Sequence, residues 1–187
     1  MPLAYILIIC YLIIERWLRK GKEATEFKTA RWDNGSSQVI WLVGVLSLVL
    51  LLSAPFLNSN QIGYLNSPNI AWLGIVSMLV GLALRYWAAK TLGRFYTRTL
   101  QIVEKQQLID LPPYNLIRHP GYFGTLLIEL GAAIAINNSI LILIVAIAGI
   151  FWRIYRIEAE EKMLATFFAE EYRVYTSKTW KLIPFVY

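Results

Sequence analysis

The side chains best suited to chemistry stand in polar segments that interrupt long apolar stretches. The first of these segments contains Gln106, Gln107, Leu108, Ile109, Tyr114 and the run Arg118-His119-Pro120-Gly121-Tyr122. Pro120 disfavours helical geometry at His119 and starts the next helix, so backbone N–H groups are unpaired there. A helix start flanked by Arg, His and Tyr suits the carboxylate or hydroxyls of a polar ligand. The alternative is a capped helix start with an interfacial His and Tyr.

A second segment places charged residues at helical spacing. Arg156 and Glu160 are four residues apart and share one helix face, and Arg153 precedes them by one turn. Arg153, Arg156 and Glu160 can therefore point into one pocket. The alternative is an exposed, salt-bridged helix end, in which each pair contributes only a few tenths of a kcal/mol.

Glu129 is the one acidic residue inside an otherwise apolar stretch. An ionised carboxylate within a bilayer would cost several kcal/mol unless it is paired or reaches water. Together with Tyr122 and Thr125 it forms a stripe along one helix face. Glu129 therefore either lines a cavity, or is protonated and hydrogen-bonded to a neighbouring helix.

The composition indicates a membrane protein. Of 187 residues, 57% are hydrophobic and 16% are charged, whereas a soluble domain carries about 25% charged residues. This length favours one integrated membrane domain over residues 1–187. The single cysteine, Cys10, excludes an internal disulfide, and the single histidine, His119, excludes a multi-His metal site, so we predict no metal.

The apolar stretches predict an all-α integral membrane protein with five transmembrane helices and an amphipathic C-terminal helix. The expected spans are 2–18, 38–57, 69–90, 120–136 and 139–157, each near the ~20 residues that a bilayer core requires. The arginines and aromatics of residues 84–97 are typical of an interfacial belt. Apolar residues at helical spacing over 158–176 predict a helix lying on the cytoplasmic surface.

Charge orients these spans. All 18 Lys and Arg residues follow the first, third or fifth span. Because cytoplasmic connections are enriched in positive charge, we expect the amino terminus outside and the carboxyl terminus in the cytoplasm, in the cell inner membrane if the protein is prokaryotic. The net charge of +6 therefore reflects topology, and nucleic acid is not an expected partner.

At these residues the sequence resembles the isoprenylcysteine carboxyl methyltransferase family, and more broadly the membrane methyltransferases that include phospholipid N-methyltransferases. The resemblance covers roughly residues 80 to 185. Its motifs are Leu84-Arg85-x-Trp87, Leu92-Gly93, Pro113-Tyr114, Arg118-His119-Pro120-x-Tyr122-x-Gly124, Glu160-Glu161-x-x-Leu164, Phe168-x-x-Glu171-Tyr172-x-x-Tyr175 and Leu182-Ile183-Pro184. Their order and spacing are more specific than any single motif. The compact chain looks like a prokaryotic relative.

The resemblance implies S-adenosylmethionine as cofactor at the cytoplasmic face. It implies cofactor contacts from Gln106, Gln107, Leu108, Ile109, Tyr114, His119, Pro120, Gly121, Tyr122 and Glu160. It places Arg156 on the substrate side, which makes Arg156 and Glu160 the candidate catalytic residues, and Glu129 is a further candidate for substrate binding. Two positions depart from the family pattern, with Gln106 in place of the usual His and Pro112 in place of Gly.

The function expected is methyl transfer to a lipophilic or membrane-borne substrate, a small molecule or a lipid-modified group, with carboxyl methylation of an isoprenylcysteine-like group as one form. The reaction needs alignment and exclusion of water. A carboxylate acceptor needs no general base at pH 7, whereas an amine would need one. The alternatives are a phospholipid N-methyltransferase, an NADPH-dependent sterol-type membrane reductase with a related Arg-His-Pro-x-Tyr motif, and a non-catalytic membrane assembly factor.

Overall fold

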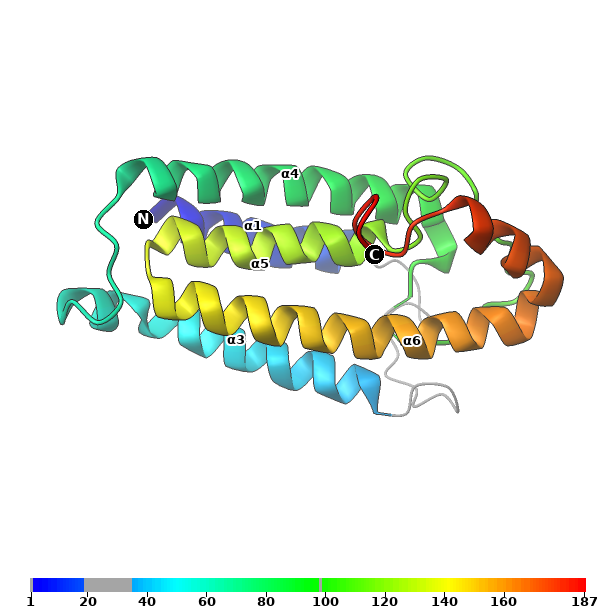
Figure 1. The fold of residues 1–187 in the computed structure, drawn as a ribbon, viewed down its shortest axis with the longest axis horizontal. Coiled ribbons are helices and arrows are strands. Elements are labelled where there is room, and N and C mark those ends of the chain that lie inside the picture. Colours follow the sequence, from blue (N-terminus) through cyan, green and yellow to red (C-terminus); the bar gives the residue numbers. More distant parts are fainter. Residues whose placement is uncertain (1, 19–34, 98) are drawn as a thin grey trace.

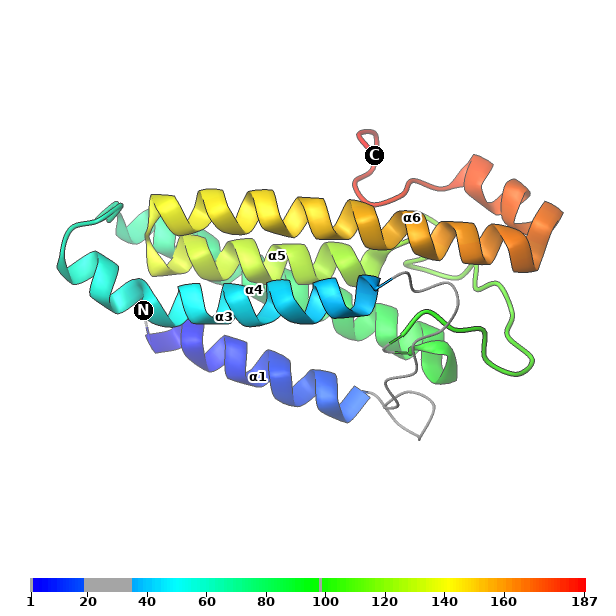
Figure 2. The same cartoon turned by 90° about the horizontal axis from the view of Figure 1, so that it is seen from below.

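A computed structural model describes residues 2–18, 35–97 and 99–187, and over these residues the protein is helical with no β-strand. The elements are α1 (Pro2–Leu18), α3 (Ser36–Ser59), α4 (Pro68–Leu92), the short 3₁₀ helix η1 (Gly93–Phe95), α5 (Pro120–Ile136) and α6 (Ser139–Lys178). The long helices form an elongated bundle, with all of them running along its length (Figures 1 and 2). The α3–α4 connection and the α5–α6 turn lie at one end, called here the turn end. Residues 93–119 lie at the opposite end, called the loop end.

Helices α4 and α5 pack unusually closely because glycines face each other. A Cβ added to Gly74 would lie only 2.3 Å from the backbone nitrogen of Ala135, and one added to Gly131 would lie 2.7 Å from the carbonyl oxygen of Gly74. Gly81 and Gly124 repeat the arrangement, with corresponding distances of 2.6 and 2.8 Å to each other's carbonyl oxygens. Small residues let helix backbones approach in membrane proteins, where close packing replaces the hydrophobic driving force.

A polar cluster joins the helices at the turn end. Asn138 caps α6 by accepting hydrogen bonds from the backbone of Ile140 and Leu141. Its side-chain nitrogen donates to Asn58 Oδ1 and to the carbonyl oxygen of Ile62, both at 2.8 Å. The break at residues 137–139 thus joins two antiparallel helices, as the sequence predicts.

Three helices are long and apolar enough to cross a membrane by length and composition: Ser36–Ser59, Pro68–Phe95 and Ser139–Lys178. The other two, α1 and α5, have 17 residues each. The fold is therefore that of a helical membrane protein, while the count of five crossings stays a prediction. Residues 19–31 and Arg98, whose charges contribute to the expected orientation, lie outside the described residues.

Helix α6 differs from the expectation of a span ending at 157 and a separate helix over 158–176. It continues to Lys178, interrupted only by Ala169, whose φ of 45° and ψ of −113° are not helical. No Gly or Pro follows Gly149 within α6, so nothing in the sequence stops the helix near residue 157. The uninterrupted part before Ala169, residues 139–168, corresponds to roughly 45 Å, about one and a half times the thickness of a bilayer core, and this length places its charged carboxyl-terminal part beyond that core.

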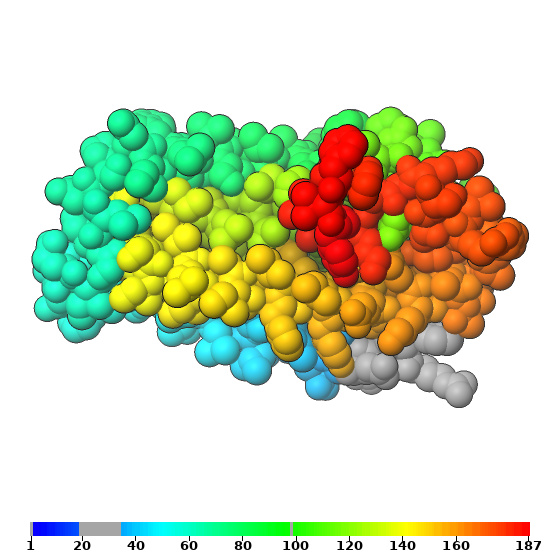
Figure 3. All heavy atoms as spheres, in the orientation of Figure 1, coloured from blue at the N-terminus to red at the C-terminus, as the bar shows by residue number. Residues whose placement is uncertain are grey.

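At the Ala169 kink the chain turns back, and the last part of α6 already runs back along the bundle (Figure 1). Residues 179–187, called here the C-terminal strap, run beside residues 116–119 and lie across the surface near the start of α5 (Figure 3). The backbone N–H groups of Arg118 and His119 donate to the carbonyl oxygens of Trp180 and Lys181, at 2.8 and 3.1 Å. Leu182 packs with Leu126 and Ile157 in a small second core.

Candidate active site

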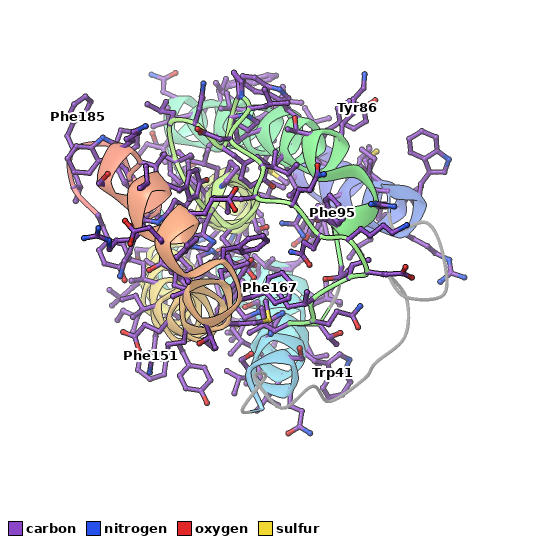
Figure 4. The ribbon with its side chains drawn as sticks, turned by 90° about the vertical axis from the view of Figure 1, so that its right-hand side faces the viewer. Trp41, Tyr86, Phe95, Phe151, Phe167 and Phe185 are labelled. Carbon is purple, nitrogen blue, oxygen red and sulfur yellow. The ribbon has the colours of Figure 1, made fainter. Side chains whose placement is uncertain are left out.

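A cavity of about 470 Å³ lies within the bundle and combines a polar and an apolar part. Polar groups of α5, α6 and residues 96–119 line the loop end. Along α1 and α3 the lining becomes apolar, and this part is called the apolar arm. Its residues are Ile8, Leu12, Ile40, Trp41, Gly44, Val45, Leu48 and Leu51. In the view onto the loop end, Trp41 and Phe95, which both line the cavity, lie on the side between α1 and α3, whereas Tyr86 and Phe151 project outward (Figure 4).

The cavity brings together most of the residues singled out from sequence. Those that line it are Gln106, Tyr114, His119, Gly121, Tyr122, Glu129, Arg156 and Glu160. The other four do not line it: Gln107, Leu108, Ile109 and Pro120. Of these, Pro120 is buried at the start of α5. Gln106 accepts a hydrogen bond from the backbone of Val103 at 2.8 Å and so also shapes its own loop.

Tyr122 links the two charged residues of α6 across the cavity. Its hydroxyl donates to Glu160 Oε2 at 2.6 Å and accepts from Arg156 Nε at 3.2 Å. Arg156 is only 3% exposed, and it also donates to the hydroxyls of Ser36, at 2.5 Å, and Ser37, at 3.1 Å. The exposed, salt-bridged helix end considered from sequence is therefore excluded, because this guanidinium is buried and donates hydrogen bonds to residues of α3 and α5.

His119 lies between two adjacent carboxylates. Its Nε2 is 3.3 Å from Glu161 Oε1, and its Nδ1 is 3.9 Å from Glu160 Oε2. The imidazole stacks on the Tyr122 ring, with centroids 5.6 Å apart. Neighbouring glutamates of α6 thus face different groups: Glu160 faces the cavity, and Glu161 faces the loop and the strap.

Glu161 is the centre of an ion cluster that holds the loop against the C-terminal strap. Arg118 Nε donates to it at 2.7 Å, and Lys181 Nζ lies 3.5 Å away. Arg118 also donates to the carbonyl oxygen of Thr179. Burial alone would raise the pKa of Glu161, but hydrogen bonds and positive charge from His119 and Arg118 lower it to about 2.

This lowered pKa predicts an acid-sensitive strap. A carboxylate whose pKa falls on folding contributes stability above its unfolded pKa, near 4.5, and this contribution is lost as the pH falls towards 2. Hydrogen exchange of residues 179–187, corrected for the intrinsic rate, should therefore accelerate over that range. In Glu161→Gln the strap should already exchange faster at pH 6 and change little on acidification. An equal pH dependence in both proteins would contradict the assignment.

Glu129 and Arg153 form an ion pair between α5 and α6, in which Arg153 is fully buried and Glu129 is partly exposed. Both terminal nitrogens of Arg153 lie 3.1 Å from Glu129 Oε2, and Arg153 also donates to the carbonyl oxygens of Gly149 and Tyr122. Of the two alternatives for Glu129, the cavity position is the one observed. The expectation that Arg153 shares the pocket with Arg156 and Glu160 is wrong, because Glu129 and these carbonyls hold its guanidinium out of the lining.

A third buried arginine, Arg85, is not among the site residues expected from the sequence. Arg85, expected to snorkel in an interfacial belt, is 9% exposed and lines the cavity. It is ion-paired with Glu15 of α1 and donates to Thr125 Oγ1 at 2.6 Å. Tyr96 donates to the same Glu15 oxygen at 2.9 Å. The sequence feature that could have indicated this pair is Glu15, the first acidic residue of the chain. It stands at the end of an apolar stretch, where a carboxylate requires a partner.

Thr99 supplies a hydroxyl without a partner. It is 2% exposed, it lines the cavity, and its Oγ1 has no hydrogen-bond partner among the described residues. Burying such a group unpaired costs free energy, so it is suited to a ligand. The same lining offers the Glu160 carboxylate, the Gln106 amide and the Tyr114 ring, which suit the hydroxyls, amino groups and base of a nucleoside.

The fold and cavity define a helical membrane protein with a buried, charged ligand site that continues into an apolar arm. The profile of the isoprenylcysteine carboxyl methyltransferase (ICMT) family matches residues 72–166, and the chain belongs to this family. The family profile thus covers α4, η1, α5 and most of α6.

Individual relatives agree with this placement. A rice protein (Oryza sativa subsp. indica) described as a probable protein-S-isoprenylcysteine O-methyltransferase is 33% identical over 121 residues, which are 63% of this chain and 62% of the relative. The Bacillus subtilis protein YpbQ is 24% identical over 84% of this chain and 95% of its own length. A solved structure of the eukaryotic intramembrane Ras methyltransferase ICMT superposes with a TM-score of 0.66 at 25% identity, over 80% of this chain and 53% of that one. The chain thus spans little more than half of the eukaryotic relatives.

Proposed function

We propose that this protein is an S-adenosylmethionine-dependent methyltransferase that methylates a carboxylate on a lipid-bearing substrate, in the manner of an isoprenylcysteine group. The observation that carries the proposal is the composition of the cavity. A buried guanidinium, that of Arg156, lies where the polar part meets an apolar arm along α1 and α3. Such a site suits a substrate with an anionic head and a hydrophobic tail.

The residues assigned to the cofactor are those of the polar part. We assign Glu160, His119, Tyr114, Gln106 and Thr99 to its hydroxyl, amino and base groups, on the strength of their positions in the lining. When bound, S-adenosylmethionine supplies a methyl group on a positively charged sulfur. Gln107, Leu108 and Ile109, which the resemblance also implies, stay predictions because they do not line this cavity.

Arg156 is assigned to the carboxylate of the substrate. A planar guanidinium holds a carboxylate with two parallel hydrogen bonds, which orients the acceptor oxygen. Tyr122, Ser36 and Ser37 fix the position of Arg156 by accepting hydrogen bonds from its Nε and Nη1, and a carboxylate that binds with two parallel hydrogen bonds replaces at least one of these acceptors. A carboxylate is already ionised at pH 7, so His119 is assigned to binding and not to proton transfer.

Ligand-induced stabilisation tests the cofactor class. S-adenosylhomocysteine should raise the melting temperature of the detergent-purified protein, whereas NADPH should not, because only binding to the folded state stabilises it. Purified protein should then transfer radiolabel from S-adenosylmethionine to N-acetyl-S-farnesylcysteine as a base-labile ester. Stabilisation by NADPH alone would favour the reductase, base-stable labelling of phospholipid amines would favour an N-methyltransferase, and binding of neither cofactor would favour an assembly factor.

We further propose that all five long helices cross the membrane, with the loop end in the cytoplasm. Among the described residues, positive charges gather at the loop end, while residues 59–67 and 137–139 at the turn end contain none.

Single cysteines in a Cys10→Ser background test the orientation. Ile62→Cys should react with an impermeant maleimide from outside intact cells, and Lys178→Cys only after permeabilisation. Labelling of both in denatured protein is the control. Reaction of Ile62→Cys solely after permeabilisation would reverse the topology.

A further inference from the structure

Gly44 of α3 differs from the glycines that pack α4 against α5. Gly74, Gly81, Gly124 and Gly131 allow α4 and α5 to touch, and a Cβ at any of them would approach the facing backbone to 2.3–2.8 Å. Gly44 lies in the middle of α3, where a Cβ would meet nothing within 4 Å. Close packing therefore does not explain Gly44, although glycine inside a helix is less favourable than alanine.

Gly44 lines the apolar arm, and its lack of a side chain leaves space there. It belongs to the face of α3 that lines the apolar arm, between Trp41 and Leu48. The arm lies where α1 and α3 separate: Tyr5 of α1 donates to the carbonyl oxygen of Leu51 at 3.0 Å near the turn end, and the two helices diverge towards the loop end (Figure 2). The space beside Gly44 is therefore part of the arm itself.

We propose that Gly44 determines the length and bulk of the hydrocarbon tail that the enzyme accepts. The proposal rests on the proposed function, in which the substrate carboxylate binds Arg156. Ser37, which accepts a hydrogen bond from Arg156, lies seven residues before Gly44 on the same helix. At 1.5 Å per residue, Gly44 is roughly 10 Å further along the arm. A large side chain at this position closes the arm to the distal part of a long tail and leaves the region around Arg156 open.

Gly44→Phe tests this assignment, with Val49→Phe as the matched control. Val49 is on the same helix, is 57% exposed and does not line the cavity. Methyl transfer is measured for N-acetylcysteine carrying an S-geranylgeranyl or a short S-butyl group. The ratio of kcat/KM for the long over the short substrate should fall at least about tenfold in Gly44→Phe, mainly through KM, and stay unchanged in Val49→Phe, because a hydrophobic pocket discriminates 10–200-fold for even one methylene.

Folding and cofactor binding are measured separately. Both variants should keep the wild-type melting temperature within a few degrees and the same stabilisation by S-adenosylhomocysteine. If Gly44→Phe does not fold, Gly44→Leu takes its place with the same expected direction. An unchanged long-to-short ratio in a folded variant, with wild-type methylation intact, would overturn the role of Gly44 alone. Absence of methylation of either substrate by the wild-type protein would instead overturn the proposed function, and with it this inference.

Discussion

Arg156→Lys should lower kcat/KM for the methyl acceptor by about a hundredfold while the affinity for S-adenosylhomocysteine changes by less than about twofold. Lysine keeps the positive charge but loses the planar fork, so the carboxylate is no longer held in one orientation. Losing a preorganised donor at a reacting centre typically lowers the rate by 10²–10³. Steady-state kinetics and cofactor titration on the same preparation provide both numbers.

Two variants on the same helix complete the test. Glu160→Gln should mainly weaken the cofactor, because its carboxylate is assigned to that ligand. Arg173→Lys should change neither quantity, since Arg173 pairs with Glu170 on the exposed surface, with 79% and 67% of their side chains accessible. If Arg156→Lys and Glu160→Gln only lowered the melting temperature and left both ligands unaffected, the pair would be purely structural.

The largest effect on stability is expected from Gly74→Ala. The added methyl group would lie 2.3 Å from the backbone nitrogen of Ala135 and 2.5 Å from the carbonyl oxygen of Gly131, so α4 and α5 must separate. The contacted atoms belong to the backbone and cannot rotate away as the end of a flexible side chain can. We therefore expect the folded protein to be destabilised by about 3 kcal/mol. This corresponds to a melting temperature lower by roughly 6 to 12 °C for a chain of this size.

The same substitution at Gly44 is the control, and its expected effect has the opposite sign. Gly44→Ala adds a methyl group to open space within a helix, which should leave the melting temperature unchanged or raise it slightly through a more restricted unfolded chain. Equal destabilisation by the two alanines would contradict the assignment, because contact between α4 and α5 would then not explain the loss of stability, and helix propensity favours alanine at both positions.

The course of the helices was largely predictable from the sequence because proline, asparagine and the charged ends mark where apolar stretches stop. The first four predicted spans begin and end within two residues of α1, α3, α4 and α5. The end of α6 was not predictable by the same means. The change from apolar to amphipathic residues near 157 marks a change of surroundings, whereas the backbone stays helical beyond it, leaves helical geometry only at Ala169, and then continues as helix to Lys178.

The sequence predicted how site residues on the same helix lie relative to one another. It did not predict contacts between site residues on different helices. The spacing of Arg156 and Glu160 places them on one face whatever surrounds them. Which arginine faces the ligand depends on how the helices are rotated about their axes. This rotation pairs Arg153 with Glu129, and Arg85 with Glu15, which is seventy residues away. A single sequence does not specify how each helix is rotated.

The wall of the cavity has two origins, and this has an evolutionary consequence. The family match spans residues 72–166, which supply most of the polar part, although Ser36 and Ser37 of α3 also contact Arg156. The apolar arm is built by α1 and α3 outside that match. On the proposed function, selection for a new lipid can therefore act on the arm residues of α1 and α3 while the residues assigned to the methyl donor are left unchanged. Relatives that diverged in acceptor are expected to record that history in their first helices, and an exchange of those helices between them is expected to carry the acceptor preference along.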